Sequence, residues 1–234
     1  MKRLAVFVEG QTEQLFAESL IREIAGQANI RFELRSIRGG AKARRQTRLL
    51  RSIPADAGQE YYVLIVDCGG DETVVSRIRE EYDNIVARGY EAIVGIRDVY
   101  PLPREDIPNL ARRIPLHVKT KPIRVVFVLA IMEVEAWFLA EYTHFERIDP
   151  ALTVARISAH LDFDPSAGDM EQRPTPAGDL HAAYQLAGLA YSKSRARVQR
   201  TVGHLDYARL YLDIPARYPS LETLVSALDR FFSA

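Results

Sequence analysis

Predicted β-strands alternate with predicted helices along the first 140 residues, and this alternation constrains the fold more than any other feature. The predicted strands span residues 3–8, 31–37, 61–66, 91–97 and 123–130. The predicted helices between them span residues 12–26, 41–52, 73–88 and 105–113, and residues 131–140 also have helical character. Strands that alternate with helices are typical of an α/β fold. We therefore expect a mostly parallel, doubly wound sheet flanked by helices.

The strand signal fades after about residue 141. The remaining predicted helices span residues 150–161, 179–189, 193–200 and 221–232. Residues 163–180 are rich in Pro, Gly and Asp, as loops are. The sequence thus predicts an α/β core over residues 1–141 and a helical C-terminal region over residues 142–234 that packs on this core.

Composition limits the class of protein. A chain of 234 residues can bury a full core without disulfides, and its one cysteine, Cys68, predicts a reducing cytoplasm. The first apolar run breaks at Glu9, too soon for a signal peptide, and no segment approaches the roughly 20 apolar residues of a membrane span. Basic and acidic residues both number 31, which argues against a polybasic tail but allows a local basic patch.

Acidic residues follow four of the predicted strands. They are Glu9, then Asp67 with Asp71 close behind, then Asp98, and finally Glu133 and Glu135. The carboxyl ends of parallel strands meet at one edge of a sheet, where several carboxylates would repel each other without a cation among them. Mg²⁺ and Mn²⁺ prefer such oxygen ligands. We therefore predict a Mg²⁺ or Mn²⁺ site with Glu9, Asp67, Asp71 and Asp98 as ligands.

Any one of these acids has a simpler interpretation. Asp and Glu often cap the helix that follows a strand, and Glu13, Asp71 and Glu72 suit such roles. The coincidence at four strand ends is what favours a metal site over capping or solvation.

Two basic clusters could bind phosphate groups. The first contains Arg35, Arg38, Lys42, Arg44, Arg45, Arg48 and Arg51, and the second contains Lys193, Arg195, Arg197 and Arg200. Within the first, we predict that nucleic acid contacts Arg38, Lys42, Arg44, Arg45 and Arg48. The alternative for both clusters is a solvated helix face that pairs with acids elsewhere. Phosphate-binding motifs of the GxxxxGK[ST] and GxGxxG types are absent, which argues against a self-contained ATPase.

The loop after the first predicted strand carries the most specific signal. Its sequence, Val8-Glu-Gly-Gln-Thr-Glu13, resembles the opening motif of the Toprim domain of topoisomerases, primases and OLD-type nucleases. The first glutamate of that motif matches Glu9. The second Toprim motif, Asp-x-Asp, matches Asp67 but not the spacing to Asp71, and Asp98 is the expected replacement ligand.

The chain is also similar to a bacterial family of Toprim-like proteins, the DUF4276 family. The resemblance rests on the opening motif, on a Glu-x-Glu-Ala-Trp segment at Glu133–Trp137 and on a Tyr-x-Lys motif at Tyr191–Lys193. It implies a Toprim-like fold and a link to phage-defence nucleases. Because the chain lacks a nucleotide-triphosphate motif of its own, we also expect a separate ATPase subunit as partner.

These observations predict a Mg²⁺- or Mn²⁺-dependent nuclease that cleaves DNA or RNA. The expected catalytic residues are Glu9, Glu13, Glu133, Glu135 and Lys193. One alternative is a non-catalytic Toprim-like module with a degenerate metal site that binds nucleotide or nucleic acid or supports assembly. Another is metal-dependent phosphotransfer on a small nucleotide. The sequence leaves open whether the protein forms a homo-oligomer.

Overall fold

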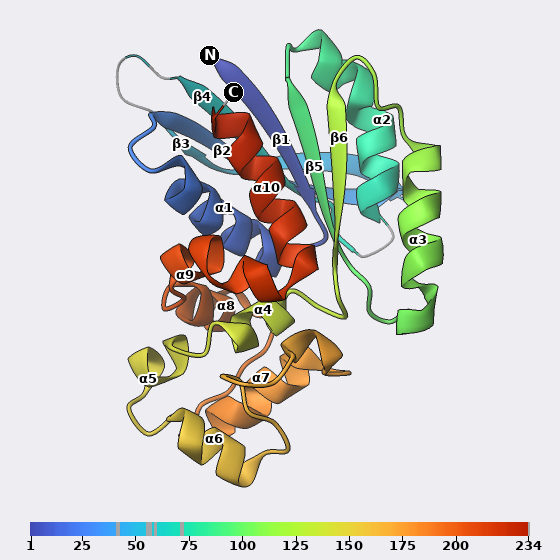
Figure 1. Cartoon of the computed structure of the whole chain (residues 1–234). Coiled ribbons are helices and arrows are strands. Elements are labelled where there is room, and N and C mark those ends of the chain that lie inside the picture. Colours follow the sequence, from blue (N-terminus) through green and yellow to red (C-terminus); the bar gives the residue numbers. More distant parts are fainter. Residues whose placement is uncertain (41–42, 55–57, 59, 71–72, 234) are drawn as a thin grey trace.

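A single sheet of six strands runs through the α/β part of the chain (Figure 1). The computed structural model describes residues 1–40, 43–54, 58, 60–70 and 73–233. The strands are β1 (Lys2–Val8), β2 (Ile30–Gly40), β3 (Ala43–Ile53), β4 (Tyr61–Asp67), β5 (Ala92–Asp98) and β6 (Arg124–Ala130). Their order is β3-β2-β4-β1-β5-β6, and every pair is parallel except β2 with β3.

Both faces of the sheet carry helices, so the predicted α/β class with a mostly parallel sheet is confirmed. α1 (Gln11–Ala25) and α10 (Pro219–Ser233) cover one face, and α2 (Thr73–Ala87) covers the other. Phe16 and Leu20 of α1 are fully buried against the first face, and Ile78 of α2 is fully buried against the second. The arrangement is consistent with a Toprim-like α/β fold.

The predicted basic helix over residues 41–52 is wrong, because residues 43–52, the part of it that the structure describes, lie in the edge strand β3. β3 pairs antiparallel with β2, with Ile37 opposite Thr47 and Leu34 opposite Arg51. A helix here would have had only Leu49 and Leu50 to bury, and both are exposed on β3. The strand instead satisfies its backbone groups by pairing with β2, and tertiary pairing of this kind overrides a weak helical preference.

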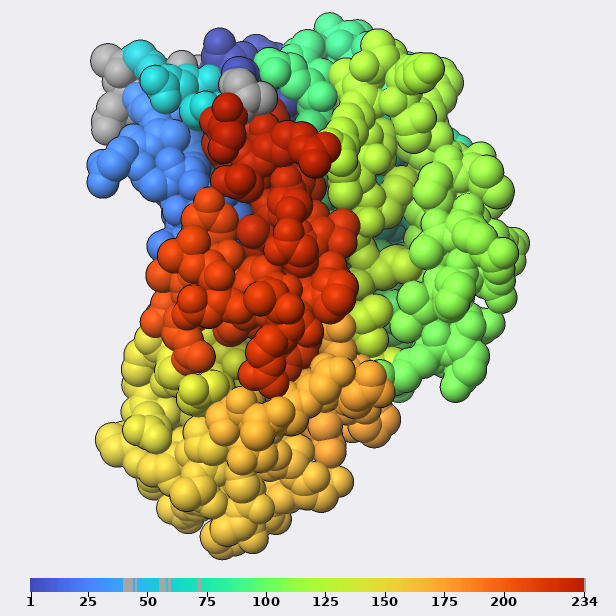
Figure 2. Space-filling model, viewed as in Figure 1, coloured from blue at the N-terminus to red at the C-terminus, as the bar shows by residue number. Residues whose placement is uncertain are grey.

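The C-terminal region is helical, as the sequence predicts. Besides α10, it contains α5 (His144–Ile148), α6 (Val154–His160), α7 (Pro176–Gln185), α8 (Arg195–Val202) and α9 (Tyr207–Leu212). Two further α-helices, α3 (Ile107–Arg113) and α4 (Glu135–Ala140), lie before residue 141. α8, α9 and α10 all contact α1. Figure 2 shows the last part of the chain, in red, lying over the N-terminal part, with the yellow and orange segments gathered at one end.

One hydrophobic core crosses the boundary that the sequence predicts at residue 141. It includes Val6 of β1, Trp137 of α4, Tyr184 of α7 and Leu228 of α10. The division into residues 1–141 and 142–234 therefore stays a prediction. None of the helices in the described part of the chain has the length and apolar character that crossing a bilayer requires.

Candidate metal centre

The carboxyl ends of the central strands bring acidic side chains to one edge of the sheet. The register places Val8, the last residue of β1, opposite Asp67 of β4 and Ile96 of β5. Glu9 follows at once, and Asp98 ends β5 two residues beyond Ile96. Asp98 therefore points to the face that α1 covers, since alternate residues of a strand share a face.

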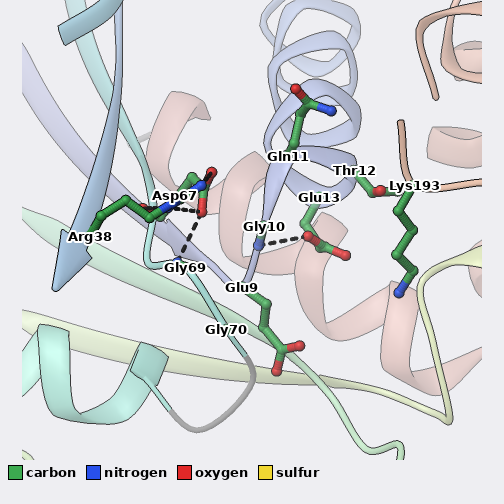
Figure 3. A pocket seen from close by; sticks show the side chains of 10 residues that line it. All are labelled: Glu9, Gly10, Gln11, Thr12, Glu13, Arg38, Asp67, Gly69, Gly70 and Lys193. Atoms are coloured by element: carbon green, nitrogen blue, oxygen red, sulfur yellow. Dashed lines mark hydrogen bonds and ion pairs between the residues drawn. The ribbon is translucent and has the colours of Figure 1, made fainter. Parts of the chain in front are cut away.

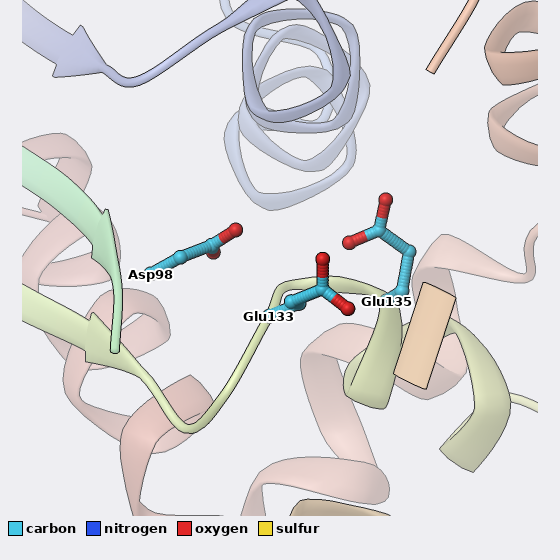
Figure 4. A group of neighbouring side chains, drawn as sticks. All are labelled: Asp98, Glu133 and Glu135. Atoms are coloured by element: carbon cyan, nitrogen blue, oxygen red, sulfur yellow. The ribbon is translucent and has the colours of Figure 1, made fainter. Parts of the chain in front are cut away.

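Three carboxylates form a buried cluster at this edge, which we call the acidic triad: Asp98, Glu133 and Glu135 (Figure 4). Each offers one oxygen, and these oxygens lie within 4.8 Å of one another. The residues are 4%, 8% and 0% exposed. The triad could hold a divalent metal ion.

A tight turn after β6 directs both glutamates toward Asp98. Met132 has a φ of 61°, in the left-handed region that side chains other than glycine rarely adopt. The backbone N–H of Glu133 donates to the carbonyl of Ile131 at 3.0 Å, and α4 begins at Glu135. Unusual backbone of this kind is often found at functional sites.

Hydrogen bonds from three distant segments hold the triad in place. The backbone N–H of Val134 donates to Asp98 Oδ1 at 3.1 Å, and that of Ala177 donates to Glu133 Oε2 at 3.0 Å. The Tyr191 hydroxyl donates to Glu135 Oε1 at 2.7 Å. Glu135 Oε2 is buried and has no hydrogen-bond partner among the described residues. A buried carboxylate oxygen without a donor is costly, and a metal ion at the triad would satisfy it.

The Lys193 ammonium lies among the three carboxylates. Its Nζ is 3.2 Å from Glu133 Oε1, 3.7 Å from Asp98 Oδ2 and 3.9 Å from Glu135 Oε2. Burial opposes its charge, but these carboxylates outweigh burial and raise the pKa of Lys193. Lys193 thus supplies one positive charge to the triad, while 48% of its side chain remains exposed.

The triad is short of positive charge even with Lys193 beside it. The pKa of Asp98 is raised well above its ordinary value. Burial is the largest cause, and repulsion from Glu13, Glu135 and Glu9 adds to it. Burial also raises the pKa of Glu135 to about 7, although Lys193 opposes this shift. Carboxyl groups in such surroundings bind a proton or a cation readily.

A hollow of about 260 Å³ opens beside the triad at the start of α1 (Figure 3). Glu9, Glu13 and Lys193 line one part of it. Glu9 Oε1 accepts a hydrogen bond of 3.0 Å from the backbone N–H of Asp98, and Glu13 Oε2 accepts one of 2.8 Å from that of Gly10. Burial raises the pKa of Glu13. Glu13 therefore caps the helix, as the sequence allows, and also faces the hollow.

Asp67 lies on the other wall of the hollow, bound to an arginine. Arg38 donates to both carboxylate oxygens of Asp67, at 2.9 and 2.6 Å, and the backbone N–H of Gly69 donates to Oδ1 at 2.9 Å. This bidentate pair already satisfies the charge of Asp67.

Among the four predicted metal ligands, the structure places Asp98 in the triad, Glu9 beside it and Asp67 against Arg38, while Asp71 lies outside the described residues. Glu133, Glu135 and Lys193, predicted as catalytic residues, meet at the triad.

The predicted nucleic-acid-binding residues separate into three groups. Arg38 pairs with Asp67, and Arg44 and Arg48 are exposed on β3. Lys42 and the side chain of Arg45 lie outside the described residues.

Sequence reasoning missed two partners of the site. The Tyr-x-Lys motif was the available signal for Tyr191, which binds Glu135. The Arg38–Asp67 pair had no signal, because it depends on the register that sets Ser36 of β2 opposite Asp67 of β4.

Comparison with known proteins identifies the family. A family model described as "Domain of unknown function (DUF4276)" matches residues 8–196. No curated protein and no solved structure matched the chain. The matched segment includes Glu9, the acidic triad and Lys193. Because the match covers well over half of the sequence, the chain belongs to the DUF4276 family.

Proposed function

We propose that this protein is a nuclease that cleaves phosphodiester bonds with Mg²⁺ or Mn²⁺ bound at Asp98, Glu133 and Glu135. The observation that carries the proposal is the acidic triad itself: three buried carboxylates within 4.8 Å, one of which has a buried oxygen without a hydrogen-bond partner among the described residues. Oxygen ligands of this kind suit hard divalent cations.

The bound metal would lower the pKa of an attacking water and stabilise charge on the phosphate oxygens. The chain's own residues have separate tasks around it. Glu13 faces the hollow with a raised pKa, so its carboxylate can accept a proton from a water molecule there. Lys193 keeps its charge and is half exposed, so its ammonium can turn toward a phosphate in the hollow. Glu9 positions Asp98 through the backbone N–H of that residue.

A non-catalytic binding module is the second candidate, and one observation favours it. Asp67, which matches the second Toprim motif, is neutralised by Arg38 instead of remaining open to a metal. With Asp67 held by Arg38, a site that binds a metal at the triad alone could bind a nucleotide or nucleic acid without cleaving it.

Cleavage assays separate the two candidates. Supercoiled plasmid, single-stranded DNA and RNA are incubated with Mn²⁺ and with wild type, Asp98→Asn, Glu135→Gln or Glu146→Gln. Glu146 is an exposed glutamate on α5 and serves as the matched control. We expect wild type and Glu146→Gln to cleave at least one substrate and both triad variants to lose about 100-fold or more in rate, since such residues contribute several kcal/mol. Equal rates in all four proteins would contradict the proposal.

The biological setting is proposed on the resemblance to Toprim-like proteins. The parallel sheet, the glutamate after β1 and the acids at the strand ends support a relationship to Toprim nucleases. On that basis we propose a role in phage defence together with a separate ATPase subunit, because the chain lacks a nucleotide-triphosphate motif of its own.

A further inference from the structure

Positive charge is concentrated in the β2–β3 hairpin. Residues 30–53 contain eight arginines and lysines and a single acid, Glu33. Because the net charge of the whole chain is zero, the rest of the molecule carries an excess of seven acidic residues. Charge divided this sharply creates a local field that attracts polyanions although the protein as a whole is neutral.

The hairpin reaches past the edge of the sheet where the acidic triad lies. β2 is level with the end of β4 at Ser36, which pairs with Asp67, and then continues to Gly40 with β3 beside it. Arg77 of α2 donates a hydrogen bond of 2.6 Å to the Gly39 carbonyl and fixes this extension. The extension is therefore held next to the hollow.

The register shows which arginines face the site. Cross-strand partners share a face, so Arg48 lies on the face of Ser36, and Arg51 lies on that of Leu34. Leu34 is buried in the core beneath α1, which is also the side of the triad. Arg38 lies on the same face and pairs with Asp67 in the wall of the hollow.

Two arginines of β3, Arg44 and Arg48, remain available to a ligand. Arg51 is bound to Glu18 of α1, and Arg38 is bound to Asp67. Arg44 and Arg48 are exposed, and neither has an acidic partner within the part of the chain that the structure describes. Guanidinium groups with free donors bind phosphate oxygens well.

We propose that the β3 side of this hairpin, from Arg48 to Arg44, binds the sugar–phosphate backbone of a polynucleotide and leads it into the hollow between Arg38 and Lys193. This inference rests on the proposed nuclease function and specifies the surface along which the substrate reaches the hollow. β3 has no aromatic side chain on which bases could stack, so recognition is through phosphate and independent of sequence. An acidic protein partner fits less well, because Gln46, Arg48 and Arg51, which the register places on one face of β3, are all polar.

Binding is measured in EDTA, so that cleavage plays no part. Fluorescence anisotropy compares wild type with the double variant Arg44→Gln/Arg48→Gln, the hairpin variant. The labelled probes are duplex DNA, single-stranded DNA, RNA and poly-glutamate. The matched control, Arg79→Gln/Arg230→Gln, removes two exposed arginines from α2 and α10. A third protein, Asp98→Asn/Glu135→Gln, alters only the triad.

We expect the hairpin variant to bind nucleic acid about tenfold more weakly. The negative slope of log K against log salt should become shallower by about two, since each lost phosphate contact removes about 0.9 from its magnitude. The control and triad variants should retain or improve binding. Equal weakening in the hairpin and control variants, no binding by wild type, or equally tight binding of poly-glutamate would overturn the proposal. Retained binding without cleavage by wild type in Mn²⁺ would contradict the nuclease function alone.

Discussion

The hydroxyl of Tyr191 donates a 2.7 Å hydrogen bond to Glu135, although 56 residues separate them in the sequence. The bond joins the loop before α8 to the first residue of α4. Lys193, two residues further on, reaches the same three carboxylates. The short Tyr191–Lys193 segment therefore supplies both a neutral donor and a positive charge to the acidic triad.

Replacing Tyr191 with phenylalanine should destabilise the metal-free protein by about 1–3 kcal/mol, because a buried carboxylate loses its donor. Urea denaturation in EDTA measures the change. Tyr211→Phe is the control, since Tyr211 donates to Asp229 at a partly exposed position and its loss should cost less than about 0.5 kcal/mol. Equal losses in the two variants would argue against a special role for the Tyr191 bond.

Replacing Lys193 with methionine should tighten Mn²⁺ binding about tenfold while it slows cleavage. The ammonium and the metal compete for the same carboxylates, so its removal favours the metal. Calorimetry with Mn²⁺ measures the affinity, and Arg195→Gln, which removes an exposed charge nearby, should leave it unchanged. Unchanged or weaker Mn²⁺ binding by Lys193→Met would show that the lysine does not occupy the cation position.

Stability without metal should fall as pH rises. The pKa of Glu135 is raised by burial from 4.5 to about 7, so between these pH values the folded protein keeps a proton that the unfolded chain releases. The free energy of unfolding should therefore decrease by a few kcal/mol from about pH 5 to pH 8. The raised pKa values of Asp98 and Glu13 act in the same direction.

Saturating Mg²⁺ should reverse this trend, since the metal requires ionised carboxylates. Urea denaturation at pH 5, 6.5 and 8, in EDTA and in Mg²⁺, tests both halves of the prediction. Glu135→Gln should show a weaker pH dependence. A free energy of unfolding that increases from pH 5 to pH 8 in the metal-free protein would contradict the prediction.

Asp67→Asn should leave Mn²⁺ affinity at the triad within about twofold, because Arg38 already satisfies Asp67. Arg38→Gln should destabilise the fold by about 1–3 kcal/mol, since Asp67 is only 2% exposed and would lose its partner, although the exposed side of Arg38 moderates the effect. The double variant should recover part of this loss. A large drop in Mn²⁺ affinity for Asp67→Asn would make Asp67 a ligand instead.

The sheet was largely predictable because its central strands are continuous apolar runs that can only be buried. β3 was not, because its stability comes from pairing with β2, and its exposed leucines and arginines show no clear period. The positions of the acidic residues in the sequence were enough to predict that they lie at the ends of the strands. The sequence could not show that the left-handed turn at Met132 groups Glu133 and Glu135 with Asp98. Nor could it show that the β2–β4 register places Arg38 beside Asp67.

A crystal structure with Mn²⁺, using anomalous diffraction to locate the ion, tests the central claim most directly. We predict one Mn²⁺ bound by oxygens of Asp98, Glu133 and Glu135, with the Lys193 ammonium displaced toward the hollow. The ligand distances should be about 2.1 Å, as for hard divalent cations in octahedral sites. An ion bound at Asp67 instead, or a triad that keeps the ammonium and binds no Mn²⁺, would contradict the account.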